Sequence, residues 1–316
     1  SGMLSCKERE TREDQVKIFL TGASGYIGGS VAARLLEEGY TVRGLVRTEE
    51  KASLVRAKGI EPVIGSLDDD ALLKREASAA DTVINAASAD HRPAAEAFLE
   101  ALSGSGKTFI HTSGSSIIGQ RDEGLYGEAL FDENTSFEPS PARAARVALN
   151  RDILAAAENG VRAVIIAPSL IYGEGLGVNP HSMQVPWLID LARRTGVARH
   201  IGPGTNVWSN VHIHDLAELY LLALNGAPAG AFFYAENGEN AMRDVCVAIS
   251  KMLGYGGGTT EMTLAEAAGH WGEGPANDTM GSNSRVRAVR ARTELGWAPA
   301  GPSLIEEIES GCYAKS

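Results

Sequence analysis

Residues 16–28 read VKIFLTGASGYIG, an apolar run followed by glycines at every third position. The apolar run predicts a buried strand, and the residues after it predict an amphipathic helix that ends at Gly39. Glycines between a strand and a helix let the backbone approach a pyrophosphate, whose charge the helix N-terminus stabilises. This stretch therefore predicts the first βα unit of a dinucleotide-binding sheet.

The rest of the first half of the chain repeats the alternation of strand and helix. Such alternation predicts βαβ units and a parallel sheet that is buried on both faces. Right-handed crossovers then give an α/β fold with a doubly wound parallel sheet, the Rossmann type. We expect further strands at 41–46, 61–65, 81–87, 107–113 and 162–168, and helices near 51–58, 69–77, 94–102 and 141–158.

After residue 171 the alternation loosens, which predicts two lobes. Residues 16–171 and 206–228 are expected to form the dinucleotide-binding Rossmann domain. Residues 172–205 are rich in glycine and proline, and residues 229–316 mix short strands with helices. We expect these two pieces to form a smaller, C-terminal substrate-binding lobe. The polar residues 1–15 are expected to form a loose tail.

Composition narrows the class of partner. The 316 residues carry a net charge of −11 with no basic block to offset it, which argues against nucleic acid and anionic membranes as partners. The longest uncharged stretch, 219–235, is interrupted by turn residues and is short for a membrane span. Three distant cysteines, Cys6, Cys246 and Cys312, predict reduced thiols. We therefore expect a cytoplasmic protein that acts on a small-molecule substrate.

The end of the second strand bears on the choice of cofactor. Proteins that bind NAD usually place a carboxylate there, on the ribose 2′-hydroxyl. This chain has no acidic residue at that point and offers Arg47, which could bind a 2′-phosphate, with Thr48 and Arg43 nearby. NADP is therefore the expected cofactor, and NAD stays open as the alternative.

A short histidine motif raises the question of a metal. His212 and His214 lie on one face of an expected strand, and Asp215 follows them as a suitable N-cap for the next helix. A zinc site requires a third and usually a fourth ligand, and none stands at a useful spacing. We expect no metal site.

Several motifs in order resemble one known family. They are TGASGYIG (21–28), NAAS (85–88), HTSGSSIIG (111–119), PSLIYGEG (168–175), NVHIHDLA (210–217) and LGWAP (295–299). Together they resemble the extended short-chain dehydrogenase/reductases, the NAD-dependent epimerase/dehydratase-like group, over about residues 16–300. The strand ending in LVR looks like the NADP-preferring members, such as the dihydroflavonol- and cinnamoyl-type reductases. Flanking helices commonly form dimers in this family, so the resemblance allows a homodimer.

The resemblance also implies an atypical catalytic centre. In the family, a serine or threonine after the fifth strand and a Tyr-x-x-x-Lys pair on the next helix transfer the proton. The segment SPARAAR at 140–146 resembles the family's S-P-Y-x-x-S-K, so Ala142 stands at the tyrosine position and Arg146 at the lysine position. Neither Tyr126 nor Tyr172 is followed by lysine at the required spacing.

Arginine keeps a positive charge for the cofactor ribose but does not give up its proton at neutral pH. Gly114 lies near the family's serine position, which leaves Ser115 and Ser116 as candidate catalytic hydroxyls with Arg146. Other candidate proton donors are Tyr126, Tyr172, His181 and an ordered water. The expected cofactor-binding residues are Gly22, Ser24, Gly25, Tyr26, Ile27, Gly28, Arg47, Thr48, Ser66, Leu67, Ala86, Ala87, Ser113, Arg146, Pro168 and Ile171.

Three functions remain open. The first is an NADP(H)-dependent oxidoreductase that reduces a small carbonyl or related substrate with a non-standard proton donor. The second is a non-enzymatic protein that binds NADP(H) or senses redox state, which the Ala142 and Arg146 positions favour. The third, a nucleotide-sugar epimerase or dehydratase, fits the fold but not the missing tyrosine, on which those reactions depend.

Overall fold

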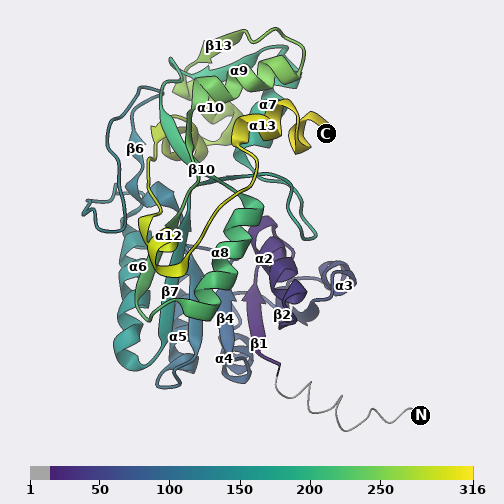
Figure 1. Ribbon diagram of the computed structural model, residues 1–316, viewed down its shortest axis with the longest axis vertical. Coiled ribbons are helices and arrows are strands. Elements are labelled where there is room, and N and C mark those ends of the chain that lie inside the picture. The colour runs from purple at the N-terminus through teal and green to yellow at the C-terminus, as the bar shows by residue number, and fades with distance from the viewer. Residues whose placement is uncertain (1–14, 316) are drawn as a thin grey trace.

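The computed structural model describes residues 15–315, so all but the last residue of the expected tail lies outside it. Within this range the central sheet has seven parallel strands in the order β11-β7-β5-β4-β1-β2-β3 (Figure 1). This order confirms the predicted doubly wound Rossmann sheet. The strands are β1 (Lys17–Thr21), β2 (Thr41–Val46), β3 (Glu61–Ile64), β4 (Thr82–Asn85), β5 (Thr108–Thr112), β7 (Arg162–Pro168) and β11 (Ala231–Ala235).

Helices cover both faces of the sheet. Apolar side chains of α2, α3 and α8 pack with one face, and those of α4, α5 and α6 pack with the other. The central strands β1, β4, β5 and β7 are therefore almost entirely buried on both sides, as their nearly continuous apolar sequences require, whereas the edge strand β3 exposes Glu61 and Ile64. The helices are α2 (Tyr26–Glu37), α3 (Glu49–Ala57), α4 (Asp70–Ala79), α5 (Arg92–Leu102), α6 (Ala144–Ala155) and α8 (Ile213–Gly226).

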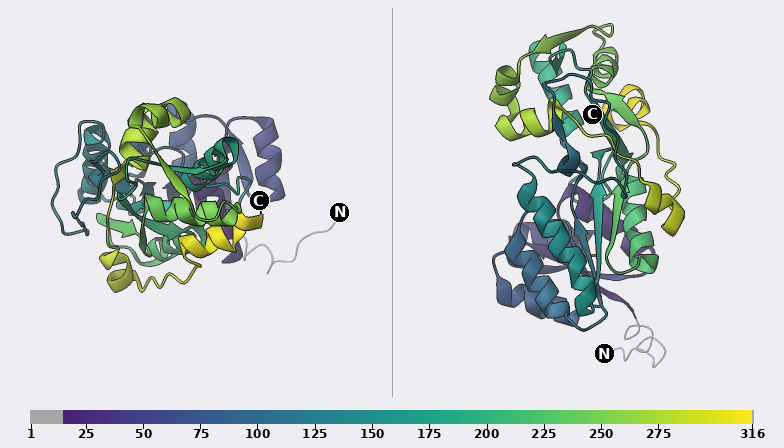
Figure 2. Two further views of the ribbon diagram at one scale, coloured as in Figure 1. Left: turned by 90° about the horizontal axis from the view of Figure 1, so that it is seen from above. Right: turned by 90° about the vertical axis from the view of Figure 1, so that its left-hand side faces the viewer.

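A smaller lobe with its own apolar core lies above the carboxyl ends of these strands (Figures 1 and 2). It contains a three-stranded sheet, β12-β10-β8, and the pair β13-β9. Its strands are β8 (Leu170–Tyr172), β9 (Ala198–Ile201), β10 (Val207–His212), β12 (Glu239–Ala241) and β13 (Thr259–Met262). Its helices are α7 (Gln184–Thr195), α9 (Met242–Met252), α10 (Leu264–Trp271), α11 (Glu273–Pro275) and α13 (Leu304–Glu309).

The division between the lobes differs from the expected one. The sequence predicts that residues 229–316 belong to the smaller lobe, but β11 is the edge strand of the central sheet, paired in parallel with β7. Helix α12 (Val289–Leu295) also packs against β11 and α8, and Trp297 belongs to the core of the large domain. In contrast, β10 lies in the segment 206–228 that was expected in the Rossmann domain, but it is not part of the central sheet and pairs with β8 and β12. The chain crosses between the lobes more often than loss of the βα alternation suggested.

Two helix starts also differ from expectation. Helix α6 begins at Ala144 and not at Pro141, because the preceding residues form a turn in which the Ser140 carbonyl accepts the N–H of Arg143. Helix α8 is capped by His212, whose Nδ1 accepts the His214 N–H at 3.1 Å. Asp215 is therefore not the N-cap. Its carboxylate accepts the backbone N–H groups of residues 300 and 301, each at 2.9 Å.

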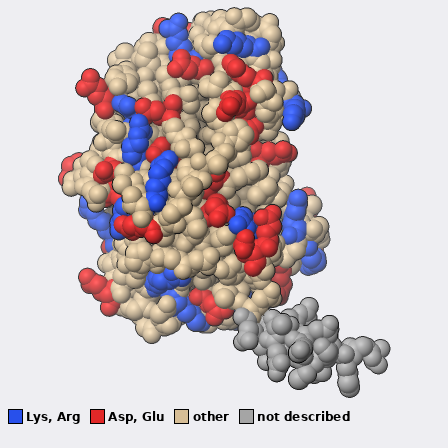
Figure 3. Space-filling view, viewed as in Figure 1, with Lys and Arg blue, Asp and Glu red and all other residues tan. Residues whose placement is uncertain are grey.

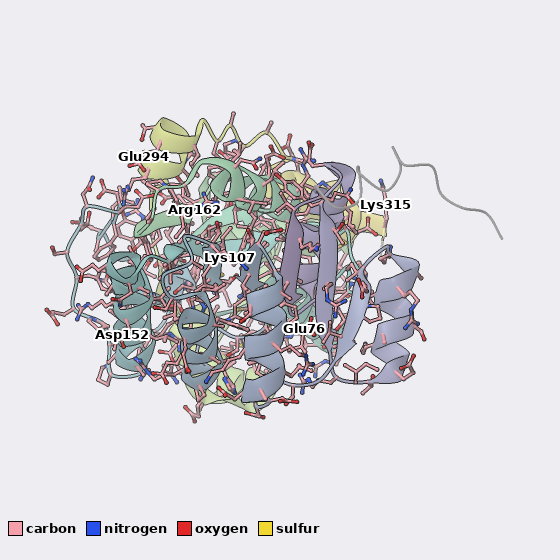
Figure 4. All side chains as sticks on the ribbon, turned by 90° about the horizontal axis from the view of Figure 1, so that it is seen from below. Glu76, Lys107, Asp152, Arg162, Glu294 and Lys315 are labelled. Atoms are coloured by element: carbon pink, nitrogen blue, oxygen red, sulfur yellow. The ribbon has the colours of Figure 1, made fainter. Side chains whose placement is uncertain are left out.

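The amino-terminal edge of the sheet is closed by polar contacts. Arg162 at the start of β7 donates to the Thr108 hydroxyl at 2.8 Å, and Lys107 donates to the Ser78 carbonyl at 2.8 Å (Figure 4). On the face shown in Figure 3, basic and acidic side chains are interspersed. Ligand sites in open parallel sheets lie at the opposite, carboxyl edge, which here faces the smaller lobe.

Candidate functional site

A cavity of about 530 Å³ lies between the carboxyl edge of the sheet and the smaller lobe. It is bounded by the start of α2, by the loops after β4, β5 and β7, by the start of α6, and by Met183, Trp208 and Thr279 from the side of the smaller lobe. The predicted site residues that line it are Tyr26, Ile27, Ala86, Ala87, Ser113, Ser115, Ser116, Arg146, Pro168 and Ile171. Segments far apart in the sequence therefore meet at one cavity, as the position of the motifs at strand ends implied.

The glycine loop at the start of α2 is shaped by close backbone packing. Gly22 has φ +75°, and a Cβ there would lie 2.6 Å from the Ala86 carbonyl oxygen. A Cβ on Gly28 would lie 2.2 Å from the Gly22 carbonyl oxygen. Gly25 is the N-cap of α2, and no side chain caps this helix end. The first N–H groups of α2 thus have no side-chain acceptor, which fits the phosphate-binding role expected of Gly22, Gly25 and Gly28.

Tyr26 and the loop after β8 hold each other in place. The Tyr26 hydroxyl donates to the Gly173 carbonyl at 2.7 Å, and the Leu176 N–H donates to the Ser30 hydroxyl at 3.0 Å. Burial raises the pKa of Tyr26 well above its ordinary value. This phenol therefore stays protonated and serves as a hydrogen-bond donor to the loop that borders the cavity.

At the end of β2, the three residues expected near a 2′-phosphate behave differently. Arg47 is exposed and makes no ion pair or hydrogen bond with the residues in the described range. Thr48 caps α3, its hydroxyl accepting the Lys51 N–H at 3.2 Å. Arg43 pairs with Glu61 and, at 2.9 Å, with Glu76. Arg43 is therefore engaged away from the strand end, and Arg47 alone of the two arginines remains available to a ligand.

The remaining cofactor candidates lie outside the cavity, in loops at the same sheet edge. Ser24 belongs to the glycine loop and is half-buried. The Ser66 hydroxyl accepts the Asp68 N–H at 3.2 Å, and Leu67 packs against the core under α4 and α5. Ser66 and Leu67 therefore stabilise the loop after β3, and neither lines the cavity.

The positions that the family resemblance assigns to tyrosine and lysine have separate environments. Ala142 is exposed in the turn before α6 and is not part of the cavity wall. Arg146 points to Asp90 and forms two hydrogen bonds with its carboxylate, at 2.7 and 2.6 Å. The third nitrogen, Nη1, donates to the Ser116 hydroxyl at 3.2 Å. The guanidinium holds the pKa of Asp90 below its usual range.

The serines after β5 are not equivalent. Ser115 is buried, and its hydroxyl is 3.0 Å from that of Ser284. Ser113 accepts a hydrogen bond from Asn150 at 2.9 Å. Ser116 is half-buried, lines the cavity, and accepts from Arg146. Ser116 is thus the hydroxyl with both a charged partner and access to the cavity.

Of the alternative proton donors, the structure brings one to the cavity. Tyr126 is largely exposed and contacts Arg285, while Tyr172 is buried with its hydroxyl donating to the Pro302 carbonyl at 2.7 Å. Neither lines the cavity. His181 does line it, from an exposed position on the loop before α7.

Two charged residues have no role predicted from the sequence, Arg143 on the cavity wall and Asp90 beside it. Asp90 follows the fourth strand and accepts hydrogen bonds from Arg146. Arg143 lines the cavity and stands three residues before Arg146 in the sequence. Asp90 could have been found from its place, because polar residues at the carboxyl ends of parallel strands gather at the ligand edge. Arg143 gave no comparable signal, since it reads as one of several arginines on a helix.

The histidine motif has other partners. His212 is buried, its Nε2 lies 2.9 Å from the Glu307 carboxylate, and burial lowers its pKa. Among residues 15–315 no group of three or more histidine, cysteine or acidic side chains could hold a metal ion. Over that same range, none of the helices combines the length and the apolar character that crossing a bilayer requires.

Sequence comparison identifies relatives along nearly the whole chain. The model of the NAD dependent epimerase/dehydratase family matches residues 18–232. An oxidase, ucsJ, of Acremonium sp. is 31% identical over 93% of this chain and 95% of its own. A 4-hydroxy-2-methyl-3-oxo-4-farnesyl-3,4-dihydroquinoline-1-oxide ketoreductase of Stigmatella aurantiaca is 27% identical over 90% and 92%. A 2-alkyl-3-oxoalkanoate reductase of Stenotrophomonas maltophilia is 25% identical over 71% of each chain.

Solved structures with the same fold are more distant in sequence. UDP-glucose 4-epimerase of Thermotoga maritima superposes with a TM-score of 0.75 at 18% identity, covering 93% of this chain and 96% of its own. dTDP-glucose 4,6-dehydratase of Bacillus anthracis, solved with NAD, gives 0.72 at 19% identity with the same coverage. These similarities establish the fold.

Proposed function

The chain belongs to the NAD dependent epimerase/dehydratase family, and we propose that it is an NADP(H)-dependent oxidoreductase that reduces a small carbonyl substrate. One observation carries the proposal. Residues beside the glycine loop, Tyr26 and Ala86, line the same cavity as Ser116 and Arg146. A cofactor held at α2 and a polarising hydroxyl can therefore act on one substrate. Two of the relatives above are named as reductases of ketone-containing compounds, which supports this reaction class.

The residues at the first βα unit fit a dinucleotide. The uncapped N-terminus of α2 would bind the pyrophosphate, and the small side chains Ala86 and Ala87 leave room beside the backbone. Arg47, exposed and without a protein partner in the described range, would bind a 2′-phosphate. The choice of NADP over NAD rests on this residue. When bound, the cofactor supplies the hydride for the carbonyl carbon.

Ser116 is our candidate for the group that acts on the carbonyl oxygen. Its hydroxyl accepts a hydrogen bond from Arg146, so its own proton is free to point to the substrate. Negative charge that develops on the substrate oxygen is stabilised by that donor and by the adjacent guanidinium. The oxygen takes the serine proton, and the serine regains one from solvent at the cavity mouth. Asp90 acts as a positioning residue, because its two hydrogen bonds orient Arg146.

Turnover over a panel of ketones, with NADPH and NADH titrated by fluorescence, tests the proposal. We expect NADPH to bind more tightly, and Arg47→Gln to weaken NADPH binding about 10-fold while NADH changes little. Arg56→Gln is the matched control, since Arg56 is an exposed arginine on the neighbouring helix α3. Tighter binding of NADH than of NADPH would contradict the assignment of Arg47.

Serine substitutions test the catalytic assignment. Ser116→Ala should lower turnover about 100-fold while leaving NADPH binding intact, since one donor to a developing oxyanion is typically worth that much. Ser115→Ala should have a smaller effect on turnover, because its hydroxyl faces Ser284.

The exposed Ala142 supports a second function, a non-catalytic protein that binds NADP(H) and reports redox state. Tight NADPH binding without turnover of any ketone would favour this alternative over the reductase.

A further inference from the structure

The cavity beside Ser116 has an unusual charge for an acidic protein. The chain has a net charge of −11, yet the described residues that line the cavity include two arginines, Arg143 and Arg146, and neither aspartate nor glutamate. The local sign is therefore opposite to that of the molecule as a whole. A cavity of this kind attracts anions.

Of the arginines around the cavity, Arg143 differs from its neighbours. Arg146 is neutralised by Asp90 through two hydrogen bonds, and Arg121 is neutralised by Asp278 in the same manner, at 2.7 and 3.0 Å. Asp90 and Asp278 are also the carboxylates whose charges act on Arg143. Each already has an arginine of its own. The charge of Arg143 is thus one positive charge in excess of the local acids.

The side chain of Arg143 is incompletely satisfied. Its Nε is buried and has no hydrogen-bond partner within residues 15–315. Burial and the nearby Arg146 lower the pKa of Arg143, so its charged form is less well stabilised here than in water. The terminal nitrogens of Arg143 likewise make no hydrogen bond or ion pair with residues 15–315, so a ligand in the cavity can supply their acceptor. Together with its place on the cavity wall, this makes Arg143 a receptor for an acceptor group.

The rest of the wall indicates what accompanies that group. Trp208, Met183 and Ile171 supply apolar surface on the side of the smaller lobe, while Tyr26 and Ala86 lie toward the glycine loop. One excess positive charge matches one negative charge. A singly charged carboxylate attached to an apolar chain fits this combination better than a nucleoside diphosphate, which carries several charges.

We propose that Arg143 binds the carboxylate of the substrate, and that this protein reduces oxo acids with an apolar chain. The proposal rests on the reductase function above and specifies its substrate class. The carboxylate accepts N–H groups of the two terminal guanidinium nitrogens of Arg143 as a pair of charge-assisted hydrogen bonds. The carbonyl of the same molecule is then held toward Ser116 in the same cavity.

A matched pair of substrates tests the proposal. The NADPH-dependent turnover of 3-oxooctanoate is compared with that of its methyl ester, which lacks the charge. We expect wild-type kcat/KM for the acid to exceed that for the ester by about 30-fold, the value of a charge-assisted hydrogen-bonded pair. Arg143→Gln should remove this preference by lowering kcat/KM for the acid alone. Arg151→Gln, at an exposed arginine of α6, the helix that Arg143 precedes, should leave both values unchanged.

Binding without turnover separates this proposal from the reductase function. Octanoate and octanamide are titrated calorimetrically into the NADPH-loaded protein, with wild type and both variants. Octanoate should bind, octanamide should bind about 30-fold more weakly, and Arg143→Gln should bind the two alike. If no ketone is turned over but octanoate binding depends on Arg143, the reductase function fails and the carboxylate site stands.

Other results overturn the carboxylate site. Equal kcat/KM for acid and ester in the wild type would do so while leaving the reductase function intact. Equal binding of octanoate by the wild type and Arg143→Gln would do so as well. If Arg143→Gln does not fold, Arg143→Lys keeps the charge but loses the paired geometry, and should retain part of the preference for the acid. The comparison of acid and ester in the wild type is decisive without any variant.

Discussion

Helices α2 and α6 both begin at the carboxyl edge of the sheet, and neither N-terminus has a side-chain cap. The N-terminus of α2 is shaped by close backbone contacts, because Gly22 and Gly28 allow approaches that a Cβ would prevent. The N-terminus of α6 is shaped by charged side chains, since Arg146 holds Asp90 and Ser116 and Arg143 faces the cavity. In our proposals the first arrangement binds an anion with main-chain N–H groups, and the second binds one with guanidinium groups.

This difference separates the two proposed tasks, binding of the cofactor and action on the substrate. The backbone site depends on residues adjacent in the sequence. The side-chain site depends on partners 56 and 30 residues distant from Arg146. We therefore expect cofactor binding to persist when the proposed catalytic groups are changed. Four predictions, in order of expected effect, test this separation.

Gly28→Ala should have the largest effect, because its Cβ would meet the backbone oxygen of Gly22 at 2.2 Å and neither atom can move alone. We expect the free energy of unfolding to fall by about 3 kcal/mol or more, with loss of NADPH binding. Urea unfolding and NADPH titration measure both. The control is Gly269→Ala in α10, where a Cβ meets nothing within 4 Å and a gain of up to about 1 kcal/mol is expected. Unchanged NADPH binding in Gly28→Ala would show that the backbone site is less constrained than its geometry implies.

NADPH binding should change little in Arg146→Gln, although the resemblance counts Arg146 among the cofactor-binding residues, because its three guanidinium nitrogens are held by Asp90 and Ser116. The same variant should lower kcat about 100-fold, equivalent to about 2.7 kcal/mol. The reason is that Ser116 loses its charged partner and Asp90 loses both hydrogen bonds. Stability should change by no more than about 1 kcal/mol, since Asp90 is 60% exposed. Arg151→Gln on the same helix is the control. A loss of NADPH binding as large as the loss of kcat would show that the two sites are not separable.

The pH dependence of stability tests a buried histidine of the central sheet, from whose carboxyl edge both helices begin. His111 in β5 is buried beside Asn85 of β4, and burial lowers its pKa from 6.5 to about 4. Between these values the unfolded chain binds the proton more readily than the folded protein, so stability is present in full above pH 6.5 and falls as the pH drops toward 4. From about pH 7 to pH 5 we expect a loss of about 2 kcal/mol from this residue.

Chemical unfolding at a series of pH values measures this loss. His111→Gln should lose less stability on acidification than the wild type, by about the same 2 kcal/mol. His270→Gln, at an exposed histidine of α10, should keep the wild-type dependence. Identical pH profiles for the wild type and His111→Gln would contradict the assignment.

Ala142→Tyr should have the smallest effect. Ala142 is exposed in the turn before α6 and lies outside the cavity wall, so restoring the family's residue type does not restore a proton donor. We expect less than about a two-fold change in kcat/KM for ketone reduction. A large gain in activity would show instead that the turn can bring position 142 to the substrate.

Much of the fold follows from local pattern. The alternation of apolar strands and helices was sufficient to predict the parallel sheet, because burial on both faces requires continuous apolar runs. It did not predict that β11 joins this sheet, since a single strand such as AFFYA carries no signal of which sheet it will enter. It also placed the start of α6 at Pro141, because local propensity does not report the turn that precedes Ala144.

The candidate site shows the same division. By itself, the sequence determined the glycine loop, the small residues after β4, and the cationic end of β2, because close backbone approach and strand position are local properties. Only the tertiary structure decided which charged side chains form pairs. Arg43 pairs with Glu76 and Arg146 pairs with Asp90, whereas Arg143 has no carboxylate partner among the described residues. Charge pairing joins residues far apart in the chain, so it depends on where folding brings them and not on their spacing.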